Sequence, residues 1–420
     1  MSYSRIKIKN YSFLYVLVLF AIVSSTLRVT NNGMTSFYRM LAPFAVLLIL
    51  ITNIKRYKTE MIFLVSAMVY SLLVSIIFFD NIELDQIIFT IYVFFLYLII
   101  KEISYKDRNF EKNFWRFINV VTTLTIIAAW LQHFVHYVLP YLNPPMKYGA
   151  MSVYFTNENE LGAALSSVFV IYLYILLFTK KKLNLVMKFN AISIPVIVFM
   201  NDAKLSMIGI VAACFLYSLY YFRKEKTFNK IGDKTYIYLI VAISSITLLG
   251  VFIINPTIHT RDYDISIQDM IFNNIIAIIT SQELEGNGTY RQRSSAIIYG
   301  FRELKKSFGF GIGIGNTVDM FSRPEYYLRY AKSMHNIMLQ FLVELGYFAV
   351  VVYIAIWKKV RKLFLSVRVE RANMLKAVFF ISLIFISAQS SVGFLSNYLE
   401  LVIIMYICLI DSKKFNELFA

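Results

Sequence analysis

Charged residues are scarce in this sequence. Only 16% of the 420 residues are charged, whereas 58% are hydrophobic and 17% are aromatic. A soluble globular protein is closer to half apolar and a quarter charged, so this composition excludes an ordinary soluble domain. Apolar stretches recur along nearly the whole chain, and most are long enough to cross a hydrocarbon core of roughly 30 Å. The sequence therefore predicts an all-α integral membrane protein with many spans.

Cysteine and histidine are also scarce, which limits disulfide and metal chemistry. The two cysteines, Cys214 and Cys408, both fall inside predicted spans, so there is no disulfide framework to interpret. His133 and His136 form the one closely spaced histidine pair, and they have no acidic or thiol partner nearby. We interpret them as interfacial residues, and we predict neither a metal site nor a cofactor.

The apolar stretches predict twelve spans with both termini in the cytoplasm. No small-residue cleavage site follows the basic start of the chain, so the first apolar run is predicted to be a span rather than a signal peptide. Most of the 42 lysines and arginines then fall in cytoplasmic segments, as the positive-inside rule requires. The net charge of +17 is therefore a topology signal and an attraction to anionic lipid headgroups, not a nucleic-acid footprint. The predicted spans are at about 11–27, 37–53, 61–79, 86–100, 117–139, 161–179, 189–201, 204–222, 236–255, 337–356, 374–390 and 394–410.

One connection is much longer than the others and divides the chain into three parts. Residues 1–255 hold the first nine spans, residues 256–334 form a large outer loop, and residues 335–420 hold the last three spans and the cytoplasmic C-terminus. The Phe, Tyr and Ile content of the loop argues against disorder. We expect it to be an ordered cap over an outward-facing cavity, with a helix at 296–307, where apolar residues have helical spacing.

The loop contains the glycine-rich run FGFGIGIGN at 308–316. A phosphate-binding loop needs a preceding strand, a following helix and usually a lysine, and the sequence shows none of these here. The run is instead predicted to be a closely packed re-entry segment, in which glycine permits unusual backbone angles.

Polar residues interrupt the start of the tenth predicted span, which reads SMHNIMLQFLVELGYFAV at 333–350. Asn336, Gln340 and Glu344 share one helix face, and Glu344 lies roughly 13 Å deeper than His335. One interpretation is the wall of a wet cavity, because polar groups at membrane depth are costly unless they line water. The other is helix capping and hydrogen bonding between helices.

Two further polar clusters fall on the same outer side in this topology. They are VYFTNENELG at 153–162 and VFMNDAKLS at 198–206. Lys204 in the second cluster, together with Arg291 and Arg293 before the glycine-rich run, would offer positive charge to phosphate oxygens. The alternative is that the arginines are solvated loop residues and that Lys204 extends its ammonium group toward water.

The order of these motifs resembles the O-antigen polymerase and ligase superfamily of bacteria. That family carries HN-x-x-L-Q-x-x-x-E-x-G after its large loop, met here by His335, Asn336, Leu339, Gln340, Glu344 and Gly346. Upstream it carries an arginine, a helical stretch and G-x-G-x-G-N, met by Arg293 (with Arg291 as a close rival), Gly311, Gly313, Gly315 and Asn316. An aromatic-x-x-x-Asn pattern is met by Asn157 and Asn159. One departure is Ala203–Lys204, where the family often has Ser-Arg, so the bidentate arginine fork is lost there.

The resemblance implies a metal-independent glycosyltransferase in the bacterial cytoplasmic membrane, with its active site facing outward. It would move glycan from undecaprenyl diphosphate to an acceptor hydroxyl. Arg291 or Arg293 and Lys204 would stabilise the leaving diphosphate, and His335 would act as the base or hold the diphosphate as an imidazolium. Glu344 and Gln340 would orient sugar or histidine, while Asn159 and Asn336 would line the cavity. The expected partners are the lipid-linked oligosaccharide, membrane lipid and a chain-length regulator.

Four functions remain open at this stage. An O-antigen or capsule-type polymerase, which joins lipid-linked repeat units, is favoured because such enzymes vary widely in sequence and the match is patchy. A ligase would instead move finished glycan to a lipid core. A lipid-linked oligosaccharide flippase would also have about twelve spans, but two similar halves would be expected, and none is visible. A channel or solute transporter is a more distant alternative.

Overall fold

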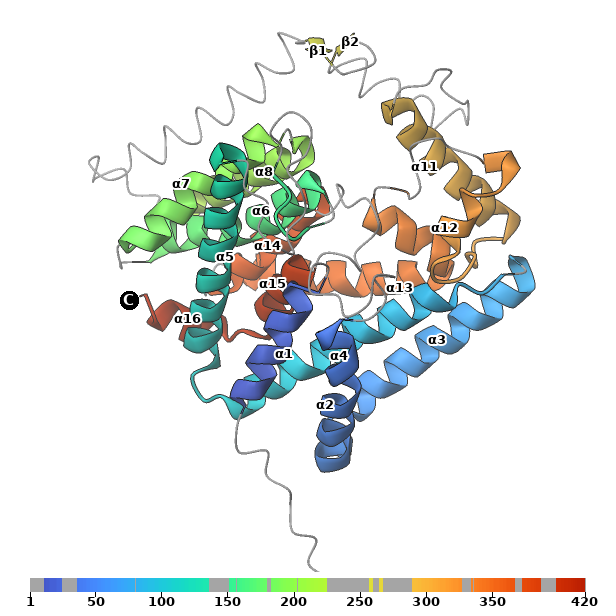
Figure 1. Cartoon of the computed structure of the whole chain (residues 1–420), viewed down its shortest axis with the longest axis horizontal. Helices are drawn as coiled ribbons and strands as arrows, with labels where there is room; N and C mark the ends of the chain where they lie inside the picture. The colour runs from blue at the N-terminus through green and yellow to red at the C-terminus, as the bar shows by residue number, and fades with distance from the viewer. Residues whose placement is uncertain are drawn as a thin grey trace, which may run out of the picture.

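The computed structural model describes residues 11–24, 36–79, 81–135, 151–155, 157–179, 183–201, 203–224, 257–259, 264–266, 289–326, 334, 336–366, 372–386 and 398–419. These residues are almost entirely helical (Figure 1). The exceptions to the all-α prediction are two three-residue strands, β1 (Thr257–His259) and β2 (Asp264–Ser266), which pair antiparallel. The helices are α1 (Ser12–Ile22), α2 (Phe37–Asn53), α3 (Lys58–Phe78), α4 (Leu84–Lys106), α5 (Phe110–Val135), α6 (Glu158–Phe178), α7 (Leu185–Met200), α8 (Lys204–Lys224), α11 (Thr289–Lys306), α12 (Asn316–Met320), α13 (Ile337–Ser366), α14 (Ala372–Ile386), α15 (Tyr398–Leu409) and α16 (Ser412–Glu417), with short 3-10 turns η1 (Ile54–Arg56) and η3 (Pro324–Tyr326).

Apolar helices occur where eleven of the twelve spans were predicted. Within the described residues, six are long and apolar enough to cross a membrane, namely Phe37–Arg56, Lys58–Phe78, Leu84–Lys106, Phe110–Val135, Glu158–Phe178 and Ile337–Leu363. Five shorter apolar helices account for five further predictions, at Ser12–Ile22, Leu185–Met200, Leu205–Tyr220, Asn373–Ile386 and Tyr398–Leu409. The span predicted at 236–255 lies outside the described residues. The total of twelve spans therefore stays a prediction.

Some helices extend beyond the ends of the predicted spans. Charged residues mark the predicted membrane boundary there, but they do not end the helix. Helix α13 continues to Ser366, past the basic turn that begins at Lys358, because lysine and arginine are good helix formers. Helix α5 begins at Phe110, seven residues before the predicted span. The short α16 was not predicted, and its N-terminus is capped by the Asp411 carboxylate, which accepts from the amides of Lys413 and Lys414.

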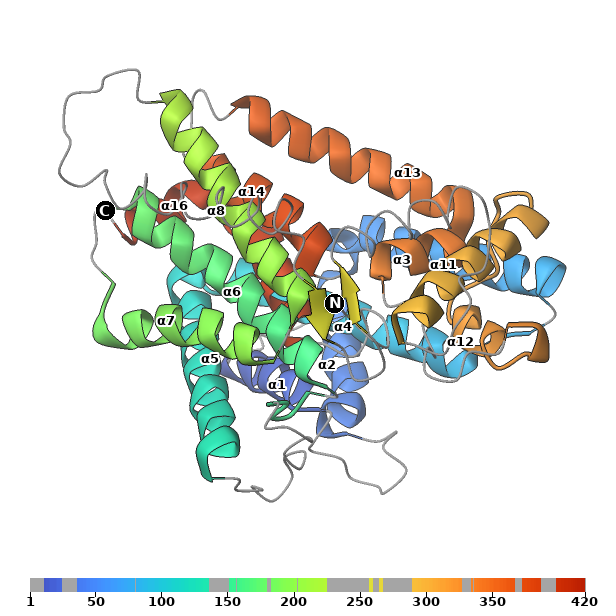
Figure 2. The ribbon, with the colours of Figure 1, turned by 90° about the horizontal axis from the view of Figure 1, so that it is seen from above.

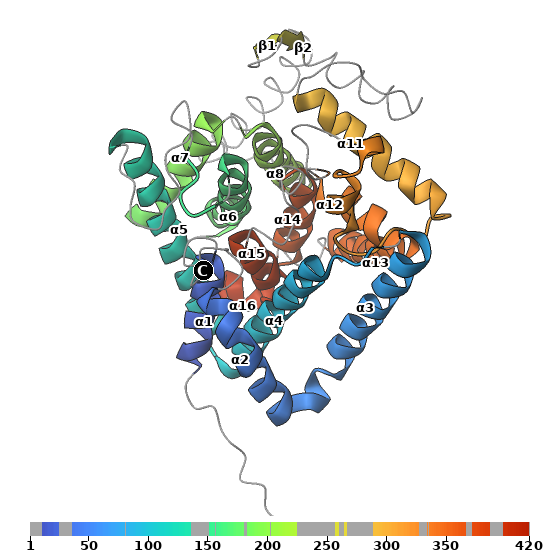
Figure 3. The same cartoon turned by 45° about the vertical axis from the view of Figure 1, so that its right-hand side comes forward.

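The helices pack in two groups, and α6 is the central helix of the larger one. About 83% of its apolar window is buried, against 22–39% for the other five long apolar helices. It packs against α7, α8, α14 and α15, an arrangement visible in Figure 3. Small residues allow this close approach, as at Gly162, where an added Cβ would lie 2.7 Å from the Cβ of Ala203.

A second group forms around the outer-loop residues. Helix α13 packs against α3, α11, α12 and α14. Figure 2 shows the start of α13 beside α11, α12 and the end of α3. The helix predicted at 296–307 is thus confirmed as the greater part of α11, and α11 packs onto α13.

The ends of α2, α3 and α4 that are predicted to be cytoplasmic meet at the buried carboxylate of Glu102. This side chain is fully buried. It accepts hydrogen bonds from the Tyr57 hydroxyl and from the Asn53 amide at 3.4 Å, and it pairs with Lys106 at 2.9 Å and Arg56 at 3.7 Å. A buried carboxylate is tolerated only with such partners, so Glu102 fixes three helix ends to one another.

We predict that Glu102→Ala destabilises the protein, because the buried tyrosine and basic groups lose their shared acceptor. The expected loss in the free energy of unfolding is about 2–4 kcal/mol. It would be measured as a lower thermal midpoint in detergent. Asp85→Ala removes an exposed acid from the same helix and should change little. Equal midpoints for the two variants would contradict the assigned role of Glu102.

Candidate functional site

The glycine-rich run adopts a backbone that side chains rarely allow. Its alternate glycines all have positive φ: +84° at Gly309, +94° at Gly311, +92° at Gly313 and +87° at Gly315. Residues with a Cβ are strained in this region, whereas glycine is not. The predicted unusual backbone angles are confirmed. The alternating glycines in the sequence therefore correspond to a repeating backbone conformation.

Helix α13 is broken at Gly346, which belongs to the second motif. Gly346 has φ +49° and ψ −126°, and these angles are not helical. A broken helix exposes backbone carbonyl and amide groups that need new partners, and within a membrane those partners must come from the protein. Broken helices of this kind are found where backbone lines a site rather than lipid.

The glycine-rich run supplies the backbone partners that the break in α13 requires. The amide of Ile312 donates to the carbonyl of Val343 at 3.1 Å, and the amide of Gly313 donates to the carbonyl of Glu344 at 2.8 Å. In return, the amide of Tyr347 donates to the carbonyl of Gly309 at 3.0 Å. The two backbones approach so closely that an added Cβ at Gly311 would lie 2.6 Å from the Glu344 carbonyl oxygen. The two motifs therefore form one backbone-paired unit.

Helix α3 forms the other wall of this unit. The amide of Ile314 donates to Ser71 Oγ at 2.8 Å, and the side-chain amide of Asn316 donates to Ser75 Oγ at 3.1 Å. The Tyr70 hydroxyl donates to the carbonyl of Phe310 at 2.7 Å. The glycine-rich run thus lies between α3 and α13 and is hydrogen-bonded to both, which confirms that it is closely packed.

Glu344 lies beneath the end of the glycine-rich run. Its side chain is 3% exposed. Its Oε1 accepts from the Thr317 hydroxyl at 2.5 Å and from the Gln340 side-chain amide at 2.9 Å. The carboxylate therefore joins α12 to the first half of α13.

The remaining polar residue of this helix face caps α13. The Asn336 side chain accepts from the amide of Leu339 at 3.1 Å, and its carbonyl accepts from the amide of Gln340 at 2.8 Å. These contacts match the interpretation of the polar face as capping and hydrogen bonding between elements. Roles for Asn336 and Gln340 toward a substrate stay predictions.

Helix α11 packs against a residue just before α13 and against the first half of α13. An added Cβ at Gly300 would lie 2.6 Å from Cε of Met334 and 3.0 Å from a methyl group of Val343. The position of Arg293 shares the Gly300 face of α11, roughly 10 Å along the axis, because seven residues make about two turns. The side chains of Arg291 and Arg293, and the whole of His335, lie outside the described residues. The structure does describe the two chain neighbours of His335, Met334 and Asn336.

The two other polar clusters meet at the start of α6. The Asn201 side chain accepts from the amide of Met151 at 2.9 Å, and it donates to the carbonyls of Met151 at 2.8 Å and Glu158 at 3.3 Å. Asn157 caps α6 by accepting from the amide of Glu160 at 3.0 Å. The clusters at 153–162 and 198–206 therefore contact each other, whereas the prediction that both lie on the outer side of the membrane stays a prediction.

Of the other predicted residues in these clusters, Asn159 is half-buried in the first turn of α6. Lys204 opens α8. The side chain of Lys204 lies outside the described residues, so its predicted role stays a prediction.

Several polar contacts at the site were missed by the sequence analysis. Ser71 and Ser75 of α3 and Thr317 of α12 bind the two motifs, although they belong to neither. Gln132 of α5 accepts from the amides of Ser152 and Val153, both at 2.9 Å. The four-residue spacing of the two serines within an apolar span was the one available signal, since it places both hydroxyls on one helix face.

A tyrosine and an ion pair fix the end of α11 beside the glycine-rich run. Lys306 donates to Glu303 at 2.7 Å, and the Tyr326 hydroxyl also donates to Glu303. The hydrogen bond to Glu303 raises the pKa of Lys306, so this lysine is positively charged at neutral pH. Burial raises the pKa of Tyr326, which keeps its hydroxyl protonated as a donor.

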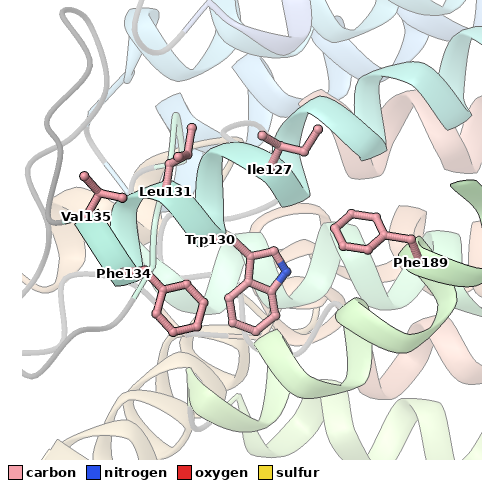
Figure 4. Close-up of a pocket in the computed structure, with 6 residues that line it drawn as sticks. All are labelled: Ile127, Trp130, Leu131, Phe134, Val135 and Phe189. Atoms are coloured by element: carbon pink, nitrogen blue, oxygen red, sulfur yellow. The ribbon is translucent and has the colours of Figure 1, made fainter.

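A groove of about 510 Å³ lies elsewhere, between α5 and α7 (Figure 4). Its lining is aromatic and aliphatic, from Ile127, Trp130, Leu131, Phe134, Val135 and Phe189. None of the predicted site residues lines it. Within the described residues, no group of three His, Cys, Asp or Glu side chains could hold a metal ion.

Residues 189–354 match the family model described as O-antigen ligase. This match covers less than half of the chain and supports the O-antigen ligase and polymerase superfamily. The match begins within α7 and ends within α13, so it contains both motifs and the contacts between them. Asn157 and Asn159 lie before it. No curated protein and no solved structure matched the chain. The family and the apolar helices together indicate a multi-pass membrane protein with an O-antigen ligase- or polymerase-type activity.

We predict that Gly313→Ala disrupts the backbone-paired unit. The added Cβ would clash with Ser75 Oγ and lie 3.0 Å from the Ser71 carbonyl, at a φ of +92°. The cost should exceed about 2 kcal/mol, measured as a lower thermal midpoint in detergent. Adding Ser75→Gly to this variant should restore part of the loss. If Gly313→Ala alone left the midpoint unchanged, the glycine-rich run would not lie between α3 and α13.

Proposed function

We propose that the protein is a polysaccharide polymerase of the O-antigen or capsule type. It transfers glycan from undecaprenyl diphosphate to a hydroxyl of another lipid-linked repeat unit, on the outer face of the bacterial cytoplasmic membrane. The single observation that carries the proposal is the direct backbone pairing of the glycine-rich run with the break at Gly346. This pairing joins the two motifs within the matched family region.

In the proposed reaction, the acceptor oxygen attacks the anomeric carbon of the donor sugar. The bond between that carbon and the diphosphate oxygen breaks, and the diphosphate leaves with the electron pair. The proton of the acceptor hydroxyl passes to His335. Arg291 or Arg293, with Lys204, stabilises the charge that develops on the diphosphate.

The arrangement of α11 supports these roles for the arginines and the histidine. Met334, the neighbour of His335 in the chain, packs against Gly300 on the α11 face that also carries position 293. A separation of roughly 10 Å along the helix axis suits a donor whose diphosphate and sugar lie between an arginine and a base. His335 would serve either as the base or, as an imidazolium, as a ligand of the diphosphate.

The polymerase is preferred to the ligase because the family match covers less than half of the chain and no curated protein matched. Polymerases vary in sequence with the repeat unit they join, so a match confined to the motif region suits them. A chain-length regulator is the protein partner that we propose for such an enzyme. The ligase and the flippase are the two alternatives that the opposite result of the test would indicate.

The test is the surface-glycan gel profile of cells that lack the protein, complemented by wild type or by His335→Ala. We expect single capped repeat units to persist in the deleted strain while the long-chain ladder disappears. His335→Ala should fail to restore the ladder, because loss of a general base costs about 10²–10⁴-fold in rate. Loss of even the single unit would contradict the polymerase and indicate the ligase or the flippase.

Arginine variants distinguish the two rival diphosphate contacts. Lysine keeps the charge but loses the fork, so the true contact should lose about 10²–10³-fold in transfer rate when changed to lysine. Arg291→Lys and Arg293→Lys are compared in this assay, and we expect the larger loss at Arg293. Lys305→Ala changes an exposed cation on the same helix and is the matched control. Equal activity in all three variants would remove the arginines from the mechanism.

A further inference from the structure

The first half of α13 is a separate helical piece with an anchor at each end. Three residues before its start, Met334 packs against Gly300 of α11. At its end, the helix breaks at Gly346, two residues after Glu344. The orientation of the piece is therefore set by contacts with α11 and with the glycine-rich run, not by continuity with the rest of α13.

The distal anchor depends on the Glu344 carboxylate. It lies 3% exposed, and its Oε1 already accepts from Thr317 and from Gln340. A buried carboxylate with this set of donors is satisfied without a substrate. Thr317 is the second residue of α12 and directly follows the glycine-rich run. Its hydrogen bond to Glu344 therefore connects that run to the first half of α13.

We propose that Glu344 is a positioning residue rather than a catalytic acid or base. Through Thr317 it holds the glycine-rich run and the first half of α13 in one geometry, and so fixes the position of the chain at Met334 and Asn336, between which His335 lies. The inference rests on the proposed function, because the group positioned is the proposed catalytic histidine. A displacement of about 1 Å at a reacting group can cost 10²-fold in rate.

The kinetic test compares Glu344→Gln, Thr317→Val and Thr317→Ser in purified protein supplied with lipid-linked repeat units. Glu344→Gln keeps the oxygen that accepts from Thr317 and Gln340, so the transfer rate should stay within about tenfold of wild type. Thr317→Val removes the donor and should lower kcat about 10–100-fold, with KM for the lipid-linked donor unchanged. Thr317→Ser should restore kcat.

Two results would overturn the inference. If Glu344→Gln lost at least about 10²-fold and removed a limb of the pH–rate profile while Thr317→Val was harmless, the carboxylate would be an acid or base. If kcat per folded molecule were unchanged in Thr317→Val and the yield of folded protein alone fell, the contact would be merely structural. Thr90→Val removes a hydroxyl that donates within α4 and is the matched control.

A second readout separates this inference from the proposed function. In Thr317→Val, hydrogen exchange at the amides of Ile312 and Gly313 should be faster than in wild type, because these amides donate across the junction that Thr317 fixes. Amides of α6 should be unaffected. This measurement needs no activity, so an inactive wild type would end the proposed function while still testing the anchor. Unchanged exchange at both amides would end the anchor itself.

Discussion

The site depends on the exchange of backbone hydrogen bonds between the glycine-rich run and the broken helix α13. In a membrane, a helix can break only if its free carbonyl and amide groups find partners within the protein. The carbonyls of Val343 and Glu344 and the amide of Tyr347 find them in the run. Only glycine can approach so closely at positive φ, so this pairing requires glycine at alternate positions of the run.

This constraint explains why two motifs thirty residues apart belong together. The glycine-rich run needs the break at Gly346, and the break needs the run. Ser71 and Ser75 of α3 then hold the run from its other side. A site built in this way lies where the run joins α3 to α13, which suits a reaction that depends on positioned charge and a positioned base.

Much of the fold could be predicted from the sequence, because the length of each apolar stretch is enough to predict a helix that crosses the membrane. The composition predicted a helical membrane protein, and apolar helices occur at eleven predicted spans. The backbone angles of the glycine-rich run were also predictable, since alternate glycines have few other uses. The topology predicted only that the two polar clusters share a side of the membrane, and it did not predict their hydrogen bonds at the start of α6.

Other features could not be predicted, because they are pairings between distant segments. Periodicity placed Glu344 on a polar face, but it could not identify Thr317 as its partner. Gly346 could have been an ordinary helical glycine, and its break depends on acceptors and donors from the run. The end of α13 was misplaced because the basic turn after the span is itself a good helix former.

The most direct measurement uses purified protein in lipid nanodiscs with a lipid-linked repeat unit as the one substrate. We predict that the repeat units are joined into lipid-linked oligomers while free undecaprenyl diphosphate is released, one for each new linkage. A parallel assay in liposomes measures whether the repeat units cross a bilayer. If they crossed it without any new linkage, the protein would be a transporter and the proposed chemistry would be wrong.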